Sequence, residues 1–236
     1  MSESTRLRLA PSLAVKERRL AALLGGGDPA QPRLVEAVRD AQVLGSLELA
    51  GMAATAEEVR AAGRGGDAPE PVRGLYRALT AVDARTPFSP ELTLTWHREA
   101  LGPGVFRETE LPPDAGPPAA PAAFIRGRIE SLQHWLATES GQGLKPAERG
   151  ALTLARLVEI APFEAGNGRV ARLATSHVMV GAGARPPVLM GTDGARLEEA
   201  LRLAFQLQTG PLVALLEEAS ERALDAQIQA LEEAVR

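Results

Sequence analysis

The chain has no cysteine and only three histidines among its 236 residues. The absence of cysteine excludes disulfides, thiol nucleophiles and thiolate zinc sites. The three histidines, His97, His134 and His177, are too few for a histidine-rich metal site and leave few candidates for a general base. Aromatic residues are also scarce, with five Phe, two Trp and one Tyr, so the core has to be built mainly from aliphatic side chains.

Charge and hydropathy argue against two kinds of partner. Asp and Glu number 30 against 26 Lys and Arg, a net charge of −4, which gives no basic footprint for nucleic acid. No apolar stretch reaches the roughly 18–20 residues needed to cross a bilayer, and no signal-peptide pattern opens the chain. We therefore expect a cytoplasmic protein that binds neither nucleic acid nor membrane.

Apolar residues recur with helical spacing along most of the chain, and strand signals are almost absent. This pattern predicts an all-α fold of about eight helices. The main ones are expected at 34–49, 71–82, 90–101, 124–138, 146–160, 169–180, 195–207 and from 211 onwards. The segment from Gly102 to Pro121 holds six prolines and no apolar face, which predicts a loop with one short β-hairpin near residues 105–107.

The most informative stretch is a glycine-rich turn, Gly166-Asn167-Gly168, that leads into a helix. The free N–H groups and the dipole of a helix N-terminus favour an anion. Arg169 and Arg172 lie on one face of the first turn, where two cations oppose the dipole. That arrangement is poor for stability alone and suits a polyphosphate. The alternative interpretation is an ordinary interhelical turn with solvated arginines.

This stretch resembles the signature of Fic-domain proteins, His-x-Phe-x-(Asp/Glu)-Gly-Asn-Gly-Arg-x-x-Arg. Family members typically transfer AMP from ATP to a Ser, Thr or Tyr hydroxyl of a target protein. Gly104–Arg107 and Trp96-His97-Arg98 also resemble family segments that precede the signature. The signature positions that match are Phe163, Gly166, Asn167, Gly168, Arg169 and Arg172.

The resemblance covers about 33–220 and implies a domain organisation. A Fic domain at 33–222, with an inhibitory-type helix at about 40–52 and a flap at about 102–122, would follow an N-terminal helical extension at 1–32. The end of a C-terminal helix, 223–236, would close the chain. Apolar residues in this last helix leave room for a homodimer contact; they are Leu215, Leu224, Ile228 and Leu231.

The resemblance also implies roles for the matching residues. Asn167 would contact the α-phosphate of ATP, and backbone N–H groups at Gly166 and Gly168 would line the anion site. Arg169 would hold the β-phosphate and Arg172 the γ-phosphate. The remaining implied roles are an anchor for the loop, Phe163, and a flap that docks an unknown target protein, Val105, Phe106 and Arg107.

Three positions depart from the family pattern, and all three are alanine. The position of the family's catalytic histidine is occupied by Ala161. The position of its acidic metal-binding residue is occupied by Ala165, which weakens the expected binding of Mg²⁺. Upstream, Ser46 and Gly51 match an inhibitory motif, Ser/Thr-x-x-x-Glu-Gly/Asn, whose glutamate falls at Ala50. Glu48 points to another side of the helix and does not replace it.

We therefore expect a Fic-type protein adenylyltransferase that binds ATP but is inactive in transfer. The alternative is a nucleotide-binding or non-enzymatic interaction module. A third hypothesis is transfer of another phosphate-linked group with help from water or Glu164. The alanines have two possible origins. The chain is either a natural family member that lacks the base, or a variant of an active parent in which alanine was substituted.

Overall fold

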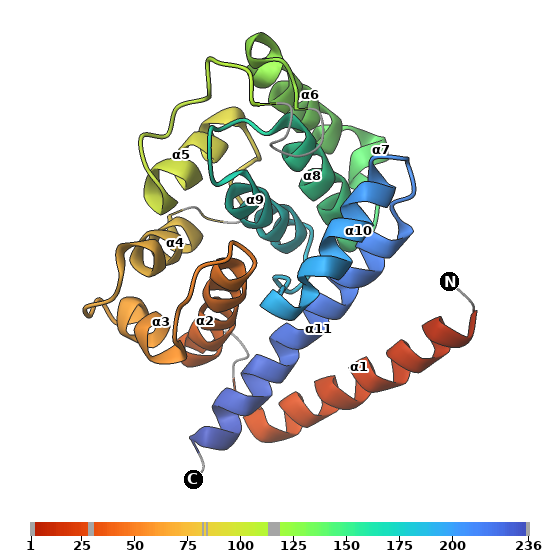
Figure 1. Ribbon diagram of the computed structural model, residues 1–236. Coiled ribbons are helices and arrows are strands. Elements are labelled where there is room, and N and C mark those ends of the chain that lie inside the picture. The colour runs from red at the N-terminus through yellow and green to blue at the C-terminus, as the bar shows by residue number, and fades with distance from the viewer. Residues whose placement is uncertain (1–2, 28–30, 82, 84, 113–118, 235–236) are drawn as a thin grey trace.

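The computed structural model describes residues 3–27, 31–81, 83, 85–112 and 119–234, and this part of the chain is helical with no strand (Figure 1). The all-α prediction is confirmed, with eleven α-helices in the described part in place of about eight. They are α1 (Glu3–Leu24), α2 (Pro32–Glu48), α3 (Ala56–Gly63), α4 (Glu70–Thr80), α5 (Pro90–Ala100), α6 (Ile125–Ala137), α7 (Glu139–Gln142), α8 (Pro146–Ile160), α9 (Asn167–Gly181), α10 (Gly194–Ala204) and α11 (Gly210–Glu233). Short 3₁₀ turns, η1 (Ala122–Phe124) and η2 (Gly191–Asp193), precede α6 and α10.

Helix α9 lies in the middle of the fold, with α2, α4, α5, α8 and α10 around it (Figure 1). Nearly every residue from Val170 to Met179 is buried, as expected for a helix that is apolar on most sides. The core around it is mainly aliphatic, which confirms the expectation from the low aromatic content. The fully buried Phe163 is an exception and lies in the loop that precedes α9.

Several helix boundaries follow from local sequence signals. Helix α8 runs from Pro146 to Ile160, as predicted. Thr55 caps α3 in a capping box, in which its hydroxyl accepts from the N–H of Glu58 at 3.2 Å. Ser89 caps α5 in the same way, by accepting from the N–H of Leu92. These caps satisfy N–H groups that the helices cannot pair internally.

The hairpin expected near residues 105–107 is not formed, because this segment pairs with the end of α8 instead of with itself. The N–H of Arg107 donates to the carbonyl of Pro162 at 3.0 Å, and the N–H of Ala120 donates to that of Glu159 at 3.2 Å. Both ends of the flap are therefore attached next to the loop before α9. The proline-rich part of the flap at 113–118 lies outside the described residues.

Helix α1 runs alongside α11 in the same direction (Figure 1). A second apolar cluster joins the two to the start of α2; it comprises Leu20, Leu34, Leu224, Ile228 and Leu231. Helix α11 continues without a break through the boundary expected at 222/223. The apolar residues considered for a homodimer contact are buried within the chain itself, so they offer no dimer surface.

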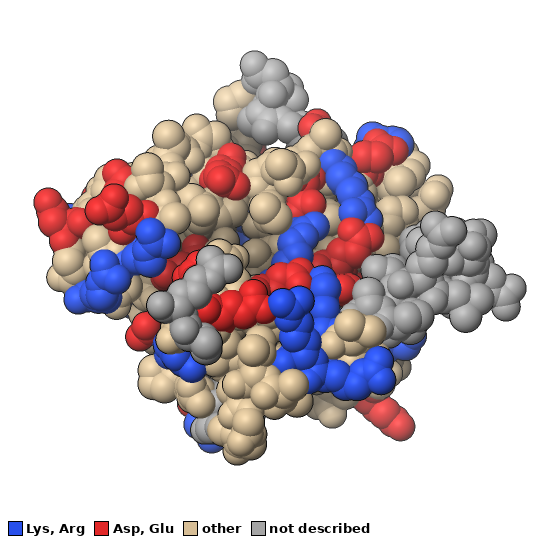
Figure 2. All heavy atoms as spheres, turned by 90° about the horizontal axis from the view of Figure 1, so that it is seen from below, with Lys and Arg blue, Asp and Glu red and all other residues tan. Residues whose placement is uncertain are grey.

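Ion pairs add to the attachment of α1. Lys16 lies 2.7 Å from Asp225, and Glu17 lies 3.2 Å from Arg185. Figure 2 shows acidic and basic side chains interleaved across this side of the molecule. No helix in the described part of the chain is long and apolar enough to cross a membrane.

Candidate functional site

Two residues with left-handed backbone shape the loop between α8 and α9. Ala161 has φ +45° and ψ +64°, and Gly166 has φ +79° and ψ +8°. At Gly166 a side chain is disfavoured on two grounds, because the backbone is left-handed and a Cβ atom there would lie 2.6 Å from Cδ1 of Leu101. Helix α9 has no side-chain cap and no acidic residue in its first turn. Its first N–H groups therefore remain available to an anion.

The side chain of Asn167 closes this loop on itself. Its Oδ1 accepts from the N–H of Phe163 at 2.8 Å, and its Nδ2 donates to the carbonyl of Phe163 at 2.7 Å. Phe163 is fully buried and anchors the loop in the core, as the resemblance implies. In this arrangement the amide of Asn167 holds the loop, so any contact that it makes with a phosphate would be additional to that task.

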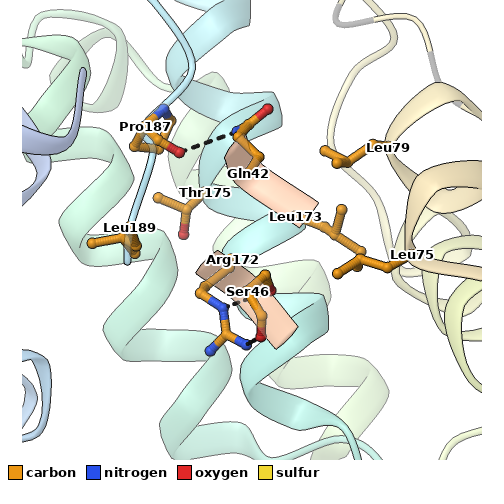
Figure 3. Close-up of a pocket in the computed structure, with 9 residues that line it drawn as sticks. All are labelled: Gln42, Ser46, Leu75, Leu79, Arg172, Leu173, Thr175, Pro187 and Leu189. Carbon is orange, nitrogen blue, oxygen red and sulfur yellow. Dashed lines mark hydrogen bonds between the residues drawn. The ribbon is translucent and has the colours of Figure 1, made fainter. Parts of the chain in front are cut away.

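The two signature arginines lie between the start of α9 and the end of α2. Arg172 donates through Nε to Oγ of Ser46 at 2.9 Å and through Nη2 to the carbonyl of Ser46 at 2.8 Å (Figure 3). Arg169 contacts the sulfur of Met52 at 3.4 Å. A Cβ atom at Gly168 would lie 3.1 Å from Nη1 of Arg172, so the guanidinium lies against the first turn of α9.

The region around the two arginines is electropositive. Burial and, secondly, the charge of Arg169 lower the pKa of Arg172 to about 10. Burial also lowers the pKa of Arg169. Both groups stay protonated at neutral pH, and an anion would relieve the cost of holding two cations close together. A cavity of about 20 Å³ lies behind Arg172, between α2, α4 and α9 (Figure 3), with room for about one water molecule.

The inhibitory-type helix is shorter than expected, because α2 ends at Glu48 and not at about residue 52. Ala50 and Gly51 lie in the following turn, where Ala50 is exposed and Gly51 has φ +70°. Glu48 does not reach Arg172, as predicted, since its carboxylate accepts from the N–H of Gly191 at 2.9 Å. Arg172 bonds to Ser46 instead, a contact that the sequence did not predict.

The two positions at which the resemblance implies a base and a metal ligand, Ala161 and Ala165, differ in exposure. Ala161 is buried, and its carbonyl accepts from Arg107 at 2.8 Å. Ala165 and its neighbour Glu164 are exposed. No group of three or more His, Asp or Glu side chains lies together in the described part of the chain. The residues present therefore do not fit a resident Mg²⁺ ion held by protein carboxylates.

Neither His134 nor His177 serves the loop. His134 is exposed on α6, and Nε2 of His177 lies 2.7 Å from the carbonyl of Thr86. His97 does contact the loop, which the sequence did not predict. Its ring stacks on Phe163 with centroids 3.9 Å apart, and its Nε2 lies 3.3 Å from the carbonyl of Ala165.

The environment of His97 favours the neutral ring. Burial is the main cause of its lowered pKa, and the charge of Arg169 lowers it further, while the contact with the Ala165 carbonyl raises it. Nδ1 of His97 is buried without a partner among the described residues. The signal for this position was the resemblance of Trp96-His97-Arg98 to the helix before the signature.

The flap residues have three different environments. Arg107 is buried and donates to the backbone carbonyls of Ala161 and Thr109, at 2.8 and 2.7 Å, and also to that of Ala120. It therefore fixes the flap to the end of α8 and is not available to dock a target. Phe106 packs 5.7 Å from the ring of Phe163, whereas Val105 is 60% exposed.

Comparison with known proteins agrees with this geometry. Residues 87–179, which include α5, the loop and most of α9, match the model of the Fic/DOC family. Over this span the chain is similar to that family. It is 29% identical over 175 residues to a protein adenylyltransferase Fic of Drosophila grimshawi, a match that covers 69% of this chain and 36% of the fly protein. It is 30% identical over 144 residues to protein adenylyltransferase fic-1 of Caenorhabditis briggsae, covering 58% and 28%.

Solved structures share the fold at lower identity. Fic-1 of Caenorhabditis elegans superposes with a TM-score of 0.74 at 23% identity, covering 97% of this chain and 77% of that one. A Fic domain containing signaling protein of Bacteroides thetaiotaomicron gives a TM-score of 0.77 at 20% identity, covering 94% and 98%. The chain spans about a third of the length of the curated relatives that it matches.

Proposed function

We propose that this chain binds ATP through the first turn of α9 and is deficient in the transfer of AMP to a protein hydroxyl. One observation carries the proposal. An uncapped helix N-terminus lies beside two arginines, which suits phosphate, whereas residue 161, where a base is expected, is alanine. The curated relatives are named as protein adenylyltransferases, which supports ATP as the nucleotide.

The phosphate-binding half of the site would be formed by groups already described. The N–H groups at the start of α9 would donate hydrogen bonds to the phosphate oxygens, and Arg169 and Arg172 would neutralise their charge. Arg172 would exchange its bonds to Ser46 for bonds to phosphate. Mg²⁺ would arrive with the nucleotide, since Ala165 provides no carboxylate for it.

The transfer half of the site lacks one group. In AMP transfer, the target hydroxyl oxygen forms a bond to the α-phosphorus while the bond to the β-phosphate oxygen breaks and pyrophosphate leaves. The hydroxyl proton must go to a base, and such a base contributes roughly 10²–10⁴-fold to rate. Ala161 has no titratable group. We place the target protein at the exposed Val105, beside the loop.

Calorimetry with ATP tests the binding half. We expect binding by the wild-type chain, a loss of at least about tenfold in affinity for Arg172→Ala, and no change for Arg73→Ala. Arg73 is a matched control because it is an exposed arginine on α4, paired with Glu70. The absence of binding, or equal losses in both variants, would contradict this half of the proposal.

Incubation with labelled ATP and a cell lysate tests the transfer half. We expect labelled protein only with Ala161→His. The substitution suits the backbone, because histidine is several-fold enriched among the non-glycine residues that adopt the left-handed conformation of residue 161. Strong labelling by the unmodified chain would refute the assignment of the missing base.

A second function, a non-enzymatic interaction module, is favoured by one observation. Arg172 already has two protein acceptors on Ser46, so the fold keeps this buried cation satisfied without a nucleotide. ATP affinity distinguishes the two functions. A dissociation constant in the millimolar range or weaker would favour the interaction module.

A further inference from the structure

A second hollow lies along the C-terminal half of α9, beyond the phosphate loop. It is enclosed by α2, the end of α4, α9 and α11, and we refer to it as the α2–α11 hollow. Its volume is about 570 Å³, within the range of about 300–1,000 Å³ that small-molecule sites occupy. The residues of α9 that line this hollow begin at Leu173, whereas the glycine-rich loop and the two signature arginines end at Arg172.

The charged residues around this hollow leave one cation without a partner. Arg185 pairs with Glu17 at 3.2 Å, and Asp83 pairs with Arg85 at 3.1 Å. Arg39, on α2, is half-buried and has no hydrogen bond or ion pair within the described part of the chain. The hollow therefore has an uncompensated positive charge in its wall.

The histidine in the wall does not supply a second charge. Burial is the main cause of the lowered pKa of His177, and the effect exceeds the opposing effects of the Thr86 carbonyl and of Asp83. Its Nε2 is engaged with that carbonyl at 2.7 Å. At neutral pH the net charge of the lining therefore comes from Arg39.

Gln42, one helical turn after Arg39 on α2, is bonded to a hydroxyl group on α9. Gln42 follows on the same face of α2, and its Nε2 donates to Oγ of Ser176 at 3.0 Å. The same Nε2 donates to the carbonyl of Pro187 at 3.1 Å, which fixes the amide (Figure 3). Ser176 accepts this bond, and its own hydroxyl proton has no acceptor among the described residues. A guanidinium and a hydroxyl donor that line the same hollow suit a carboxylate.

The rest of the wall is largely apolar. Aliphatic side chains from three helices and one indole ring line it; they are Val35, Val38, Leu79, Leu173, Val180 and Trp96. An apolar wall with a few convergent polar groups is the usual make-up of a ligand pocket. The single uncompensated charge matches one anionic group.

We propose that the α2–α11 hollow is a binding site for a small organic monocarboxylate with an apolar body. The carboxylate is held by the guanidinium of Arg39 and the hydroxyl of Ser176, and the apolar body packs against Trp96 and the aliphatic wall. The site is separate from the phosphate loop, and this inference does not rest on the proposed function.

The test uses 3-phenylpropanoate as the probe and 3-phenylpropanamide as a neutral compound of nearly the same shape. The chain has two tryptophans, and their indole N–H signals in NMR spectra report on two places. Trp96 lines the α2–α11 hollow, whereas Trp135 lines a different groove between α6 and α8. Trp135→Phe assigns the two signals.

We expect 3-phenylpropanoate to shift the Trp96 signal in a saturable way and to leave Trp135 unmoved. The amide should bind at least about tenfold more weakly, because it lacks the charge-assisted bonds. Arg39→Gln and Ser176→Ala should each weaken binding of the carboxylate. Arg33→Gln is the matched control, since Arg33 is an exposed arginine on α2 outside the hollow.

Three results would overturn the proposal. They are a Trp96 signal that does not move at saturating probe, equal affinity for the acid and the amide, and unchanged affinity in Arg39→Gln. Thermal unfolding of each variant shows whether it is folded. Arg39→Gln alone decides the matter if Ser176→Ala disturbs packing, because the Arg39 side chain has no hydrogen-bond or ion-pair partner to lose among the described residues.

Discussion

Removal of the Ser46 hydroxyl tests how α2 controls Arg172. Ser46→Ala deletes the 2.9 Å bond to Nε and keeps the 2.8 Å bond from Nη2 to the backbone carbonyl. A hydrogen bond to a charged group contributes about 1.5–3 kcal/mol, so the free energy of unfolding should fall by about that amount. For a chain of this size the melting temperature should fall by roughly 3–12 °C.

The same substitution should strengthen ATP binding. In the wild-type chain, phosphate has to replace the Ser46 hydroxyl, whereas in the variant Nε has no side-chain acceptor to give up. The gain in binding free energy should match the loss in stability, since both measure the same bond in the free protein. A loss of about 1.5 kcal/mol corresponds to a dissociation constant lower by slightly more than tenfold.

Urea unfolding and calorimetry with ATP measure the two quantities on the same protein. Ser46→Thr, which keeps the hydroxyl, should behave like wild type. Ser131→Ala is the matched control, because the exposed Ser131 on α6 bonds, among the described residues, only to the carbonyl of Gly127. The reasoning is refuted if Ser46→Ala loses stability without tighter ATP binding, or if both quantities stay unchanged.

Three further predictions concern the loop and the flap. The lowered pKa of His97 means that the unfolded chain takes up protons first, so stability should fall as the pH drops from about 6.5 towards the folded pKa. His97→Phe should make urea unfolding less sensitive to pH between 7.5 and 5.5, and an unchanged slope would contradict this. Arg107→Met leaves several buried carbonyls without a donor and should cost at least about 3 kcal/mol in urea unfolding. Arg107→Lys should recover little, because one ammonium cannot reproduce the fork of bonds; full recovery would show that charge alone matters. Gly166→Ala should lower stability by about 1–2 kcal/mol, and Leu101→Ala added to it should cost less than it does in the wild-type chain, because it removes the 2.6 Å clash. Gly210→Ala, with open space around its Cβ position, is the control, and strict additivity in the double variant would count against the clash.

Helix positions were largely predictable from the sequence because their signals are local. Proline at the first turn and the apolar spacing place α8, and side-chain caps place the starts of α3 and α5. The end of α2 was less predictable. The apolar pattern continues past Glu48, but Gly51 takes a left-handed conformation and turns the chain there.

The glycine-rich loop before α9 was also visible in the sequence, but the residues that it contacts were not. The glycines and arginines that shape the first turn of α9 are adjacent in the chain. By contrast, the contacts of Ser46 with Arg172 and of His97 with Phe163 join residues that are far apart in sequence. Arg107 illustrates the same limit, since only the packed fold brings the end of α8 to its guanidinium.

The close approach of α2 to the segment around Leu189 has a local signal in the sequence, Gly45. A Cβ atom at Gly45 would lie 1.8 Å from the carbonyl oxygen of Leu189, so only glycine allows α2 to pack against this segment. A glycine inside a helical pattern often marks such a contact. This contact holds α2 where Ser46 reaches Arg172.

The central position of α9 has a consequence for the timing of local motion. The helix that presents the proposed phosphate-binding end is surrounded by the core, so the amide hydrogens bonded within the helix should exchange with solvent only when the whole domain opens. The turn that follows α2, where Ala50 is exposed, lies outside this core and can open by itself. Slow exchange in α9 beside faster exchange at Ala50 would mean that the proposed anion site is rigid on one side and adjustable on the other.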